Sequence, residues 1–189
     1  MKKLIFLHGK GSNSNSYNDL MCEIAKYFDA DFISFNAPFK NFQKVNGYQW
    51  FNKFEHNERR NAVVKEYLQS LQYIKDQINN LHTNPKDIIL LGHSQGGGMA
   101  VHVGLEMELS GVISISGDLP YNLQYKKITN TPIYWLEGEK DTYLDENRKN
   151  SYQLILNNNN FHSLTLKNST HNEFKDDVLK LIKENTIKI

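Results

Sequence analysis

The chain is poor in the residues that mark several classes of protein. Its 189 residues include one cysteine, Cys22, so an internal disulfide is impossible and no cysteine spacing for zinc can form. Lysine and arginine total 22 against 21 aspartates and glutamates, and a formal net charge of +1 gives no sign of nucleic-acid or membrane-surface binding through charge. No apolar run approaches the roughly 18 residues that span a bilayer.

The N-terminal segment has the beginning of a signal peptide but lacks its length. Two lysines precede four apolar residues, and the apolar run ends at His8-Gly9, short of the roughly 7–15 residues that a signal peptide needs. We therefore interpret this run as a buried strand. The single cysteine agrees with a reducing compartment, and we predict a cytoplasmic protein without a membrane span.

Short apolar runs alternate with helical patterns along the whole chain. Several runs lack strict polar alternation, which is typical of strands buried on both faces of a parallel sheet. Apolar residues spaced by three, four and seven predict amphipathic helices over 57–81 and 173–184. This alternation predicts one α/β domain over 1–189, with a mostly parallel sheet of about six strands flanked by helices. The expected strands are 3–7, 32–35, 87–91, 111–115, 133–136 and 163–166.

The segment Gly92-His93-Ser94-Gln95-Gly96 matches G-x-S-x-G, the nucleophile elbow of the α/β-hydrolase fold. The serine of this elbow occupies a sharp strand-to-helix turn, where side chains at the flanking glycines would collide. An apolar run, expected to form a strand, precedes the motif, and a glycine-rich segment, expected to open a helix, follows it. This strand–turn–helix setting is the one that the elbow requires. We predict that Ser94 is a nucleophile and that the Gln95 N–H lies near the developing oxyanion. The alternative is an ordinary glycine-rich turn.

The general base is expected downstream, because the order in this fold is serine, acid, histidine. His171 follows the last predicted strand, and loops at the carboxyl ends of parallel strands meet at one rim of the sheet. His162 begins that same strand, at the opposite rim. We therefore predict His171 as the base. His93 adjoins the serine, but adjacent residues of an elbow point apart, so we interpret His93 as structural.

The acid should also follow a strand. Asp141 comes shortly after the predicted strand 133–136, where it would hold the imidazole in its useful tautomer and stabilise the imidazolium. Asp118, after the preceding strand, is the main rival, and Glu139 and Asp145 are weaker ones. The histidines elsewhere show no ligand spacing, so we predict neither a metal nor a cofactor.

Further motifs occur in order along nearly the whole chain. They are Leu7-His8-Gly9-Lys10-Gly11, Gly47-Tyr48-Gln49-Trp50-Phe51, Gly92-His93-Ser94-Gln95-Gly96-Gly97, Ser116-Gly117-Asp118-Leu119-Pro120, Gly138-Glu139-Lys140-Asp141 and finally His171. With these motifs the chain resembles the phospholipase/carboxylesterase family of small α/β-hydrolases, which is related to acyl-protein thioesterases.

The resemblance implies roles for individual residues. Ser94, Asp141 and His171 would form the triad, and the backbone N–H groups of Lys10 and Gln95 would form the oxyanion hole. Trp50 and Phe51 would wall the acyl-binding groove, although simple packing under the long loop is an equal alternative for both.

The chain departs from the family at three places near the site. The first loop has Lys10 and then Ser12-Asn13, where relatives often carry an apolar residue and then an acid, and Thr170 stands where glycine usually precedes the histidine. Thr142-Tyr143-Leu144 replaces the customary valine-proline type of sequence after the acid. These departures put substrate preference in doubt more than activity.

We predict a serine hydrolase that cleaves a small-molecule carboxylic ester or thioester through an acyl-enzyme. A small peptidase or amidase on the same fold is an alternative, because an amide needs the same nucleophile. A non-catalytic binding protein with this fold is another. The sequence leaves the acyl chain, the leaving group and the oligomeric state open.

Overall fold

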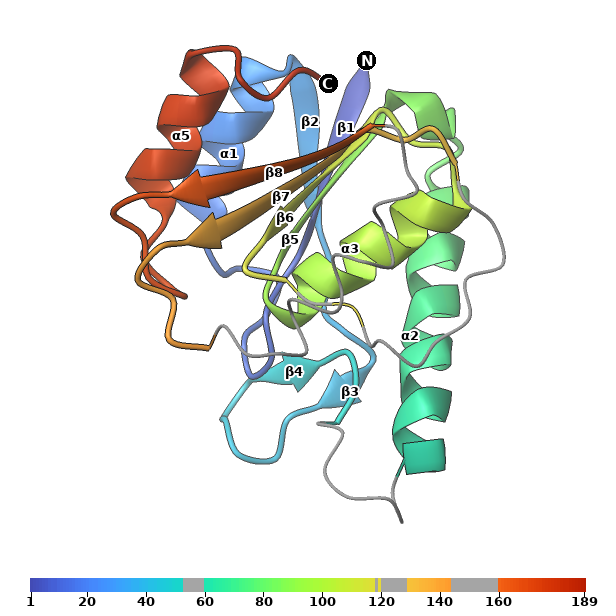
Figure 1. Ribbon diagram of the computed structural model, residues 1–189. Helices are drawn as coiled ribbons and strands as arrows, with labels where there is room; N and C mark the ends of the chain where they lie inside the picture. The colour runs from blue at the N-terminus through green and yellow to red at the C-terminus, as the bar shows by residue number, and fades with distance from the viewer. Residues whose placement is uncertain (53–59, 118, 120–128, 144–159) are drawn as a thin grey trace.

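The computed structural model describes residues 1–52, 60–117, 119, 129–143 and 160–189, with the side chains of residues 60–62 not described. A parallel sheet of six strands, in the order β2-β1-β5-β6-β7-β8, forms the centre of the described chain (Figure 1). The strands are β1 (Lys2–Leu7), β2 (Ala30–Ser34), β5 (Ile88–His93), β6 (Gly111–Ile115), β7 (Ile133–Gly138) and β8 (Phe161–Leu166). All six predicted strands are present, and the predicted α/β-hydrolase architecture is confirmed.

Helices cover both faces of this sheet. Helices α1 (Asn18–Tyr27) and α5 (Lys175–Lys183) lie together on one face, and α2 (Arg60–Asn80) and α3 (Gln95–Glu106) lie on the other (Figure 1). Each face has its own apolar cluster, built around Leu4, Ile24 and Val178 on the α1 side and around Ile5, Ile74 and Met99 on the α2 side. Within the described residues, no helix combines the length and apolar character needed to cross a bilayer.

The end of each helix follows from local sequence. Helix α2 was predicted over 57–81, and its described part ends at Asn80, before the short 3-10 helix Pro85–Asp87 that leads into β5. The predicted residues 57–59 lie outside the described residues. Helix α5 begins two residues later than predicted. Its first turn carries Asp176 and Asp177 and its last turn Lys180 and Lys183, which complements the helix dipole at both ends.

A small hairpin, absent from the sequence prediction, lies at the end of β1. Its strands are β3 (Phe39–Lys40) and β4 (Tyr48–Gln49), which pair antiparallel (Figure 1). The Gly11 N–H donates to the Tyr48 carbonyl at 2.8 Å, and the Tyr48 N–H donates to the Ser12 carbonyl at 2.8 Å. The hairpin is thereby tied to the loop that leaves the carboxyl end of β1.

Candidate active site

The segment around Ser94 has the geometry of a nucleophile elbow. Strand β5 ends at His93 and helix α3 begins at Gln95, which leaves Ser94 alone in the turn with φ 53° and ψ −121°. A positive φ is costly for a residue with a side chain and is found where the surrounding structure enforces it. A Cβ on Gly96 would lie 2.6 Å from the His8 carbonyl oxygen, and one on Gly92 would collide with the Gly96 carbonyl. Both flanking glycines are therefore required by close backbone packing.

Three predicted site residues form a continuous chain of hydrogen bonds. His171 Nε2 lies 3.1 Å from Ser94 Oγ, and His171 Nδ1 lies 2.9 Å from Asp141 Oδ2. Because an ionised carboxylate can only accept, Nδ1 carries the proton, and Nε2 is left to accept from the serine hydroxyl. The Asp141 side chain has no exposed surface, whereas 14% of the His171 side chain is exposed. The arrangement can deprotonate Ser94 and stabilise the imidazolium that results.

These residues come from three strands whose carboxyl ends meet at one rim of the sheet. Ser94 follows β5, Asp141 follows β7 and His171 follows β8. The Lys140 N–H donates to the Ser169 carbonyl at 3.0 Å, which joins the loop of the acid to the loop of the base.

The rival residues lie elsewhere or outside the described chain. His162 stacks on Tyr134 with ring centroids 4.7 Å apart, at the amino end of β8 and away from this rim. Glu139 is exposed in the turn before Asp141. Asp118 and Asp145 lie outside the described residues.

Asp141 is held by a second contact besides the imidazole. The Tyr143 N–H donates to Asp141 Oδ1 at 2.9 Å, so the two carboxylate oxygens have different partners. A carboxylate with both oxygens engaged keeps one orientation, and this orientation fixes the imidazole.

His93 supports the base loop from beside the nucleophile. Its Nε2–H donates to the His171 carbonyl at 2.8 Å, and the two rings lie 5.2 Å apart. The ring also contacts Tyr17 and Phe174, at 5.4 and 5.0 Å. Sequence reasoning assigned His93 a structural role but had no means to identify this bond, which joins residues 78 positions apart.

The loop after β1, which carries Lys10, packs against the nucleophile elbow. A Cβ on Gly9 would stand 3.3 Å from Ser94 Cβ, so this loop packs directly against the elbow. Lys10 follows Gly9, and no backbone acceptor for its N–H occurs among the described residues. Gln95 is the first residue of α3, so its N–H has no acceptor within the helix.

His8 fixes the peptide that carries the Lys10 N–H. Its Nε2 accepts from the Ala37 N–H at 3.0 Å, so the proton sits on Nδ1, which donates to the Gly9 carbonyl at 2.8 Å. Burial lowers the pKa of His8, which keeps the ring neutral and this tautomer in place. In a trans peptide the N–H points opposite to the carbonyl, so holding the Gly9 oxygen orients the Lys10 N–H.

Trp50 and Phe51 lie inside the protein, with 0% and 6% of their surface exposed. The Gln95 side chain binds their backbone: its Nε2–H donates to the Phe51 carbonyl at 2.8 Å, and its Oε1 accepts from the Trp50 N–H at 3.2 Å. The Trp50 indole N–H donates to the His8 carbonyl at 2.8 Å. These contacts support the packing role, and a direct contact of either side chain with substrate stays a prediction.

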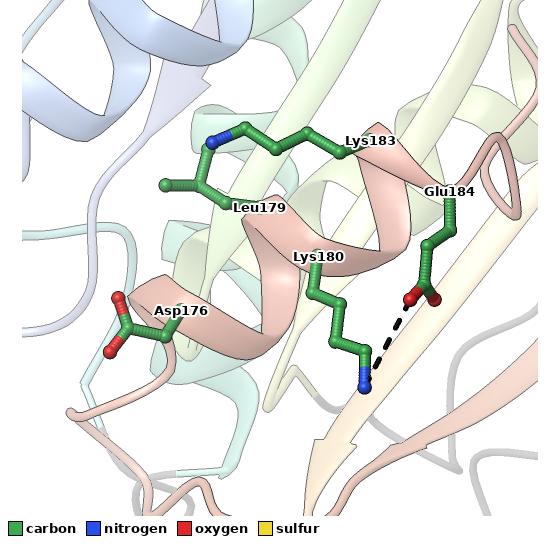
Figure 2. A pocket seen from close by; sticks show the side chains of 5 residues that line it. All are labelled: Asp176, Leu179, Lys180, Lys183 and Glu184. Atoms are coloured by element: carbon green, nitrogen blue, oxygen red, sulfur yellow. Dashed lines mark ion pairs between the residues drawn. The ribbon is translucent and has the colours of Figure 1, made fainter.

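A surface hollow elsewhere on the molecule lies along α5. Figure 2 shows the side chains that line it, with Lys180 and Glu184 paired at 4.0 Å; the lining residues are Asp176, Leu179, Lys180, Lys183 and Glu184. Apart from Leu179 these are charged residues of α5 and its C-cap, Glu184, and none belongs to the Ser94–His171–Asp141 chain. Within the described part of the chain, no group of histidine, cysteine or acidic side chains has the arrangement of a metal site.

The elbow at Ser94, on a parallel sheet of this order, defines an α/β-hydrolase. Residues 1–186 match the model of the phospholipase/carboxylesterase family, and the chain belongs to this family of esterase-type hydrolases. The resemblance seen in the sequence is thereby confirmed. No curated protein matches the chain.

Several solved structures share the fold. An esterase named PE8 has 23% identity and a TM-score of 0.74, with 98% of this chain and 91% of that chain covered. SOBER1 from Arabidopsis thaliana has 20% identity and a TM-score of 0.72, with 98% and 99% covered. A carboxylesterase from Bacillus cereus has 18% identity and a TM-score of 0.68, with 98% and 87% covered. At these identities the likeness establishes the fold alone.

Proposed function

We propose that this protein is a serine carboxylesterase or thioesterase that uses Ser94 as nucleophile, His171 as base and Asp141 as the acid that orients the base. The observation that carries the proposal is the hydrogen-bonded chain from Ser94 Oγ through the His171 imidazole to the Asp141 carboxylate. Membership of the phospholipase/carboxylesterase family supports it. The substrate is a small acyl ester or thioester, and the single cysteine agrees with a cytoplasmic location.

The acylation step follows from the positions of these atoms. Ser94 Oγ attacks the substrate carbonyl carbon while His171 Nε2 takes the hydroxyl proton. The carbonyl oxygen becomes an oxyanion that accepts from the N–H groups of Lys10 and Gln95. Loss of one such donor costs roughly 100–1,000-fold in rate in other hydrolases. His171 then delivers its proton to the leaving oxygen or sulfur, and an acyl-enzyme remains.

Deacylation uses the same groups. Water donates a proton to His171 Nε2 as it attacks the acyl carbonyl, and the acid product leaves when Ser94 recovers its proton. Every proton transfer passes through one imidazole nitrogen, so the orientation set by Asp141 serves both steps.

Covalent labelling with a fluorophosphonate, read by intact mass, tests the proposal. We expect stoichiometric labelling of the wild type, none in Ser94→Ala and a large loss of rate in His171→Ala. His162→Ala is a matched control, since it removes a histidine from β8, the strand that leads to His171, at its opposite end, and it should label like the wild type.

Two results would contradict this proposal. A folded wild type that does not label has no activated serine, and labelling that survives Ser94→Ala identifies a different nucleophile. Hydrolysis of matched acetate esters, thioesters and amides by the wild type then separates an esterase or thioesterase from an amidase, because an amide demands a better-protonated leaving group.

A further inference from the structure

Tyr143 lies directly beside the proposed base. Its ring centroid is 4.7 Å from that of His171, with 46° between the ring planes. The side chain is 64% exposed. Among the described residues, Tyr143 is the one large exposed hydrophobic side chain whose ring contacts a member of the Ser94–His171–Asp141 chain.

The backbone of Tyr143 is fixed independently of its ring. The Tyr143 N–H donates to Asp141 Oδ1, so the residue is anchored by the acid itself. A change of side chain leaves this N–H in place, and the exposed ring has little packing to lose. The ring is thus held at the imidazole while most of its surface faces outward.

The leaving group has to approach the imidazole that the Tyr143 ring contacts. To receive its proton, the leaving oxygen has to lie within about 3 Å of His171 Nε2. Nε2 is part of the imidazole whose centre is 4.7 Å from the Tyr143 ring. A group bonded to the leaving oxygen therefore lies within a few ångströms of the imidazole that Tyr143 contacts, and an aryl group that reaches the Tyr143 ring would pair with it edge-to-face or offset-stacked.

We propose that Tyr143 is a specificity-determining residue that forms an aromatic wall of the leaving-group side of the site, and that the enzyme favours esters of aryl alcohols. This inference rests on the proposed function. A bond forms between Ser94 Oγ and the carbonyl carbon, the bond to the aryl oxygen breaks, and His171 delivers the proton taken from Ser94 to that oxygen. The products are the phenol and the acyl-enzyme, which water hydrolyses.

The test compares phenyl acetate with cyclohexyl acetate, whose leaving groups have similar size and differ in aromaticity and in acidity. Each variant is therefore compared with the wild type on the same ester, because the acidity of the leaving group is the same for every protein. Both esters give the same acetyl-enzyme, and kcat/KM reports only steps in which the leaving group is present. The proteins are the wild type, Tyr143→Phe, Tyr143→Leu and the control Tyr27→Leu, which changes an exposed tyrosine of α1.

We expect Tyr143→Leu to lower kcat/KM about fivefold for phenyl acetate and less than twofold for cyclohexyl acetate, the size of effect typical of an aromatic pair. Tyr143→Phe, which keeps an aromatic ring, should lose less than Tyr143→Leu with phenyl acetate, and Tyr27→Leu should match the wild type with both esters. The rate of acetyl-enzyme hydrolysis serves as a control, because a displaced His171 imidazole would slow this step. We expect this rate to stay unchanged in every variant.

Equal losses with both esters, or no loss with phenyl acetate, would overturn the inference and leave the proposed function standing. A wild type that labels with fluorophosphonate at Ser94 but does not turn over phenyl acetate would also overturn the inference alone. A folded wild type that does not label would overturn the proposed function, and the inference with it.

Discussion

At the scale of single residues, the candidate triad depends on neighbours that contact it through the backbone. His93 binds the carbonyl of His171, Tyr143 donates its N–H to Asp141, and His8 binds the Gly9 carbonyl beside the elbow. The contacts of His93 and His8 hold loops, and that of Tyr143 holds the Asp141 carboxylate. The precision of the site therefore rests on residues whose side chains take no part in the chemistry.

Replacement of His93 tests this dependence. His93→Phe keeps a ring between Tyr17 and Phe174 but removes the donor to the His171 carbonyl, and a buried hydrogen bond contributes about 1 kcal/mol. We expect the rate constant of fluorophosphonate labelling to fall about fivefold, with partial recovery in His93→Gln, which restores an N–H donor. His162→Phe is the control. A wild-type rate in His93→Phe would show that the bond does not position the base.

At the scale of elements, a buried polar network joins α2 to α3. The Tyr67 hydroxyl lies 2.9 Å from His102 Nδ1, and His102 Nε2 lies 3.5 Å from Glu106, which also pairs with Lys75. Burial, outweighing the attraction of Glu106, lowers the pKa of His102 to about 4. The histidine is neutral in the folded protein at neutral pH, and the network is intact in that state.

This network predicts a loss of stability in acid. In the unfolded chain His102 titrates near its ordinary pKa of about 6.5, so between pH 6.5 and 4 the unfolded state binds the extra proton. The stabilisation that neutral His102 contributes to the free energy of unfolding should be complete above pH 6.5 and should be lost as the pH drops toward 4. Urea unfolding at pH 7, 5.5 and 4.5 measures it, and His102→Gln should show a shallower decline. Equal declines would contradict the assignment, since His8 contributes alike to both proteins.

At the scale of the whole molecule, the two ends of the chain meet at the rim opposite the site (Figure 1). Lys2 Nζ donates to the Ile189 carbonyl at 2.9 Å, and the Lys188 N–H donates to the Tyr134 hydroxyl at 2.9 Å. Ile187 is 3% exposed and belongs to the apolar cluster beneath α1 and α5. The last residues thus complete the core on that face.

Replacement of Ile187 by alanine measures how much the packing of the last residues contributes to stability. Ile187→Ala removes buried methyl groups and should lower the free energy of unfolding by about 2–4 kcal/mol, whereas Lys188→Ala, at an exposed side chain, should change it by less than about 0.5 kcal/mol. Chemical denaturation checks both values. Because the residue lies far from Ser94, the folded variant should label with fluorophosphonate at the wild-type rate. Equal stability of the two variants would show that the end of the chain adds nothing to the core.

The sequence by itself determined the strands, the elbow and the order of the candidate site residues. Apolar periodicity is a local property, and the carboxyl ends of parallel strands share one rim, so residues after β5, β7 and β8 could be placed together without coordinates. The G-x-S-x-G pattern likewise carries its own backbone requirement, which the positive φ of Ser94 and the crowding at Gly92 and Gly96 reflect.

Only the tertiary structure decided the contacts that hold these residues in position. Strands β3 and β4 have two residues each, too few for a periodic pattern, and they form because the loop after β1 pairs with Tyr48. The bonds from His93 to His171 and from Gln95 to Phe51 join residues 78 and 44 positions apart. Such contacts depend on how loops from separate strands pack against one another, a relation that no local pattern in the sequence encodes.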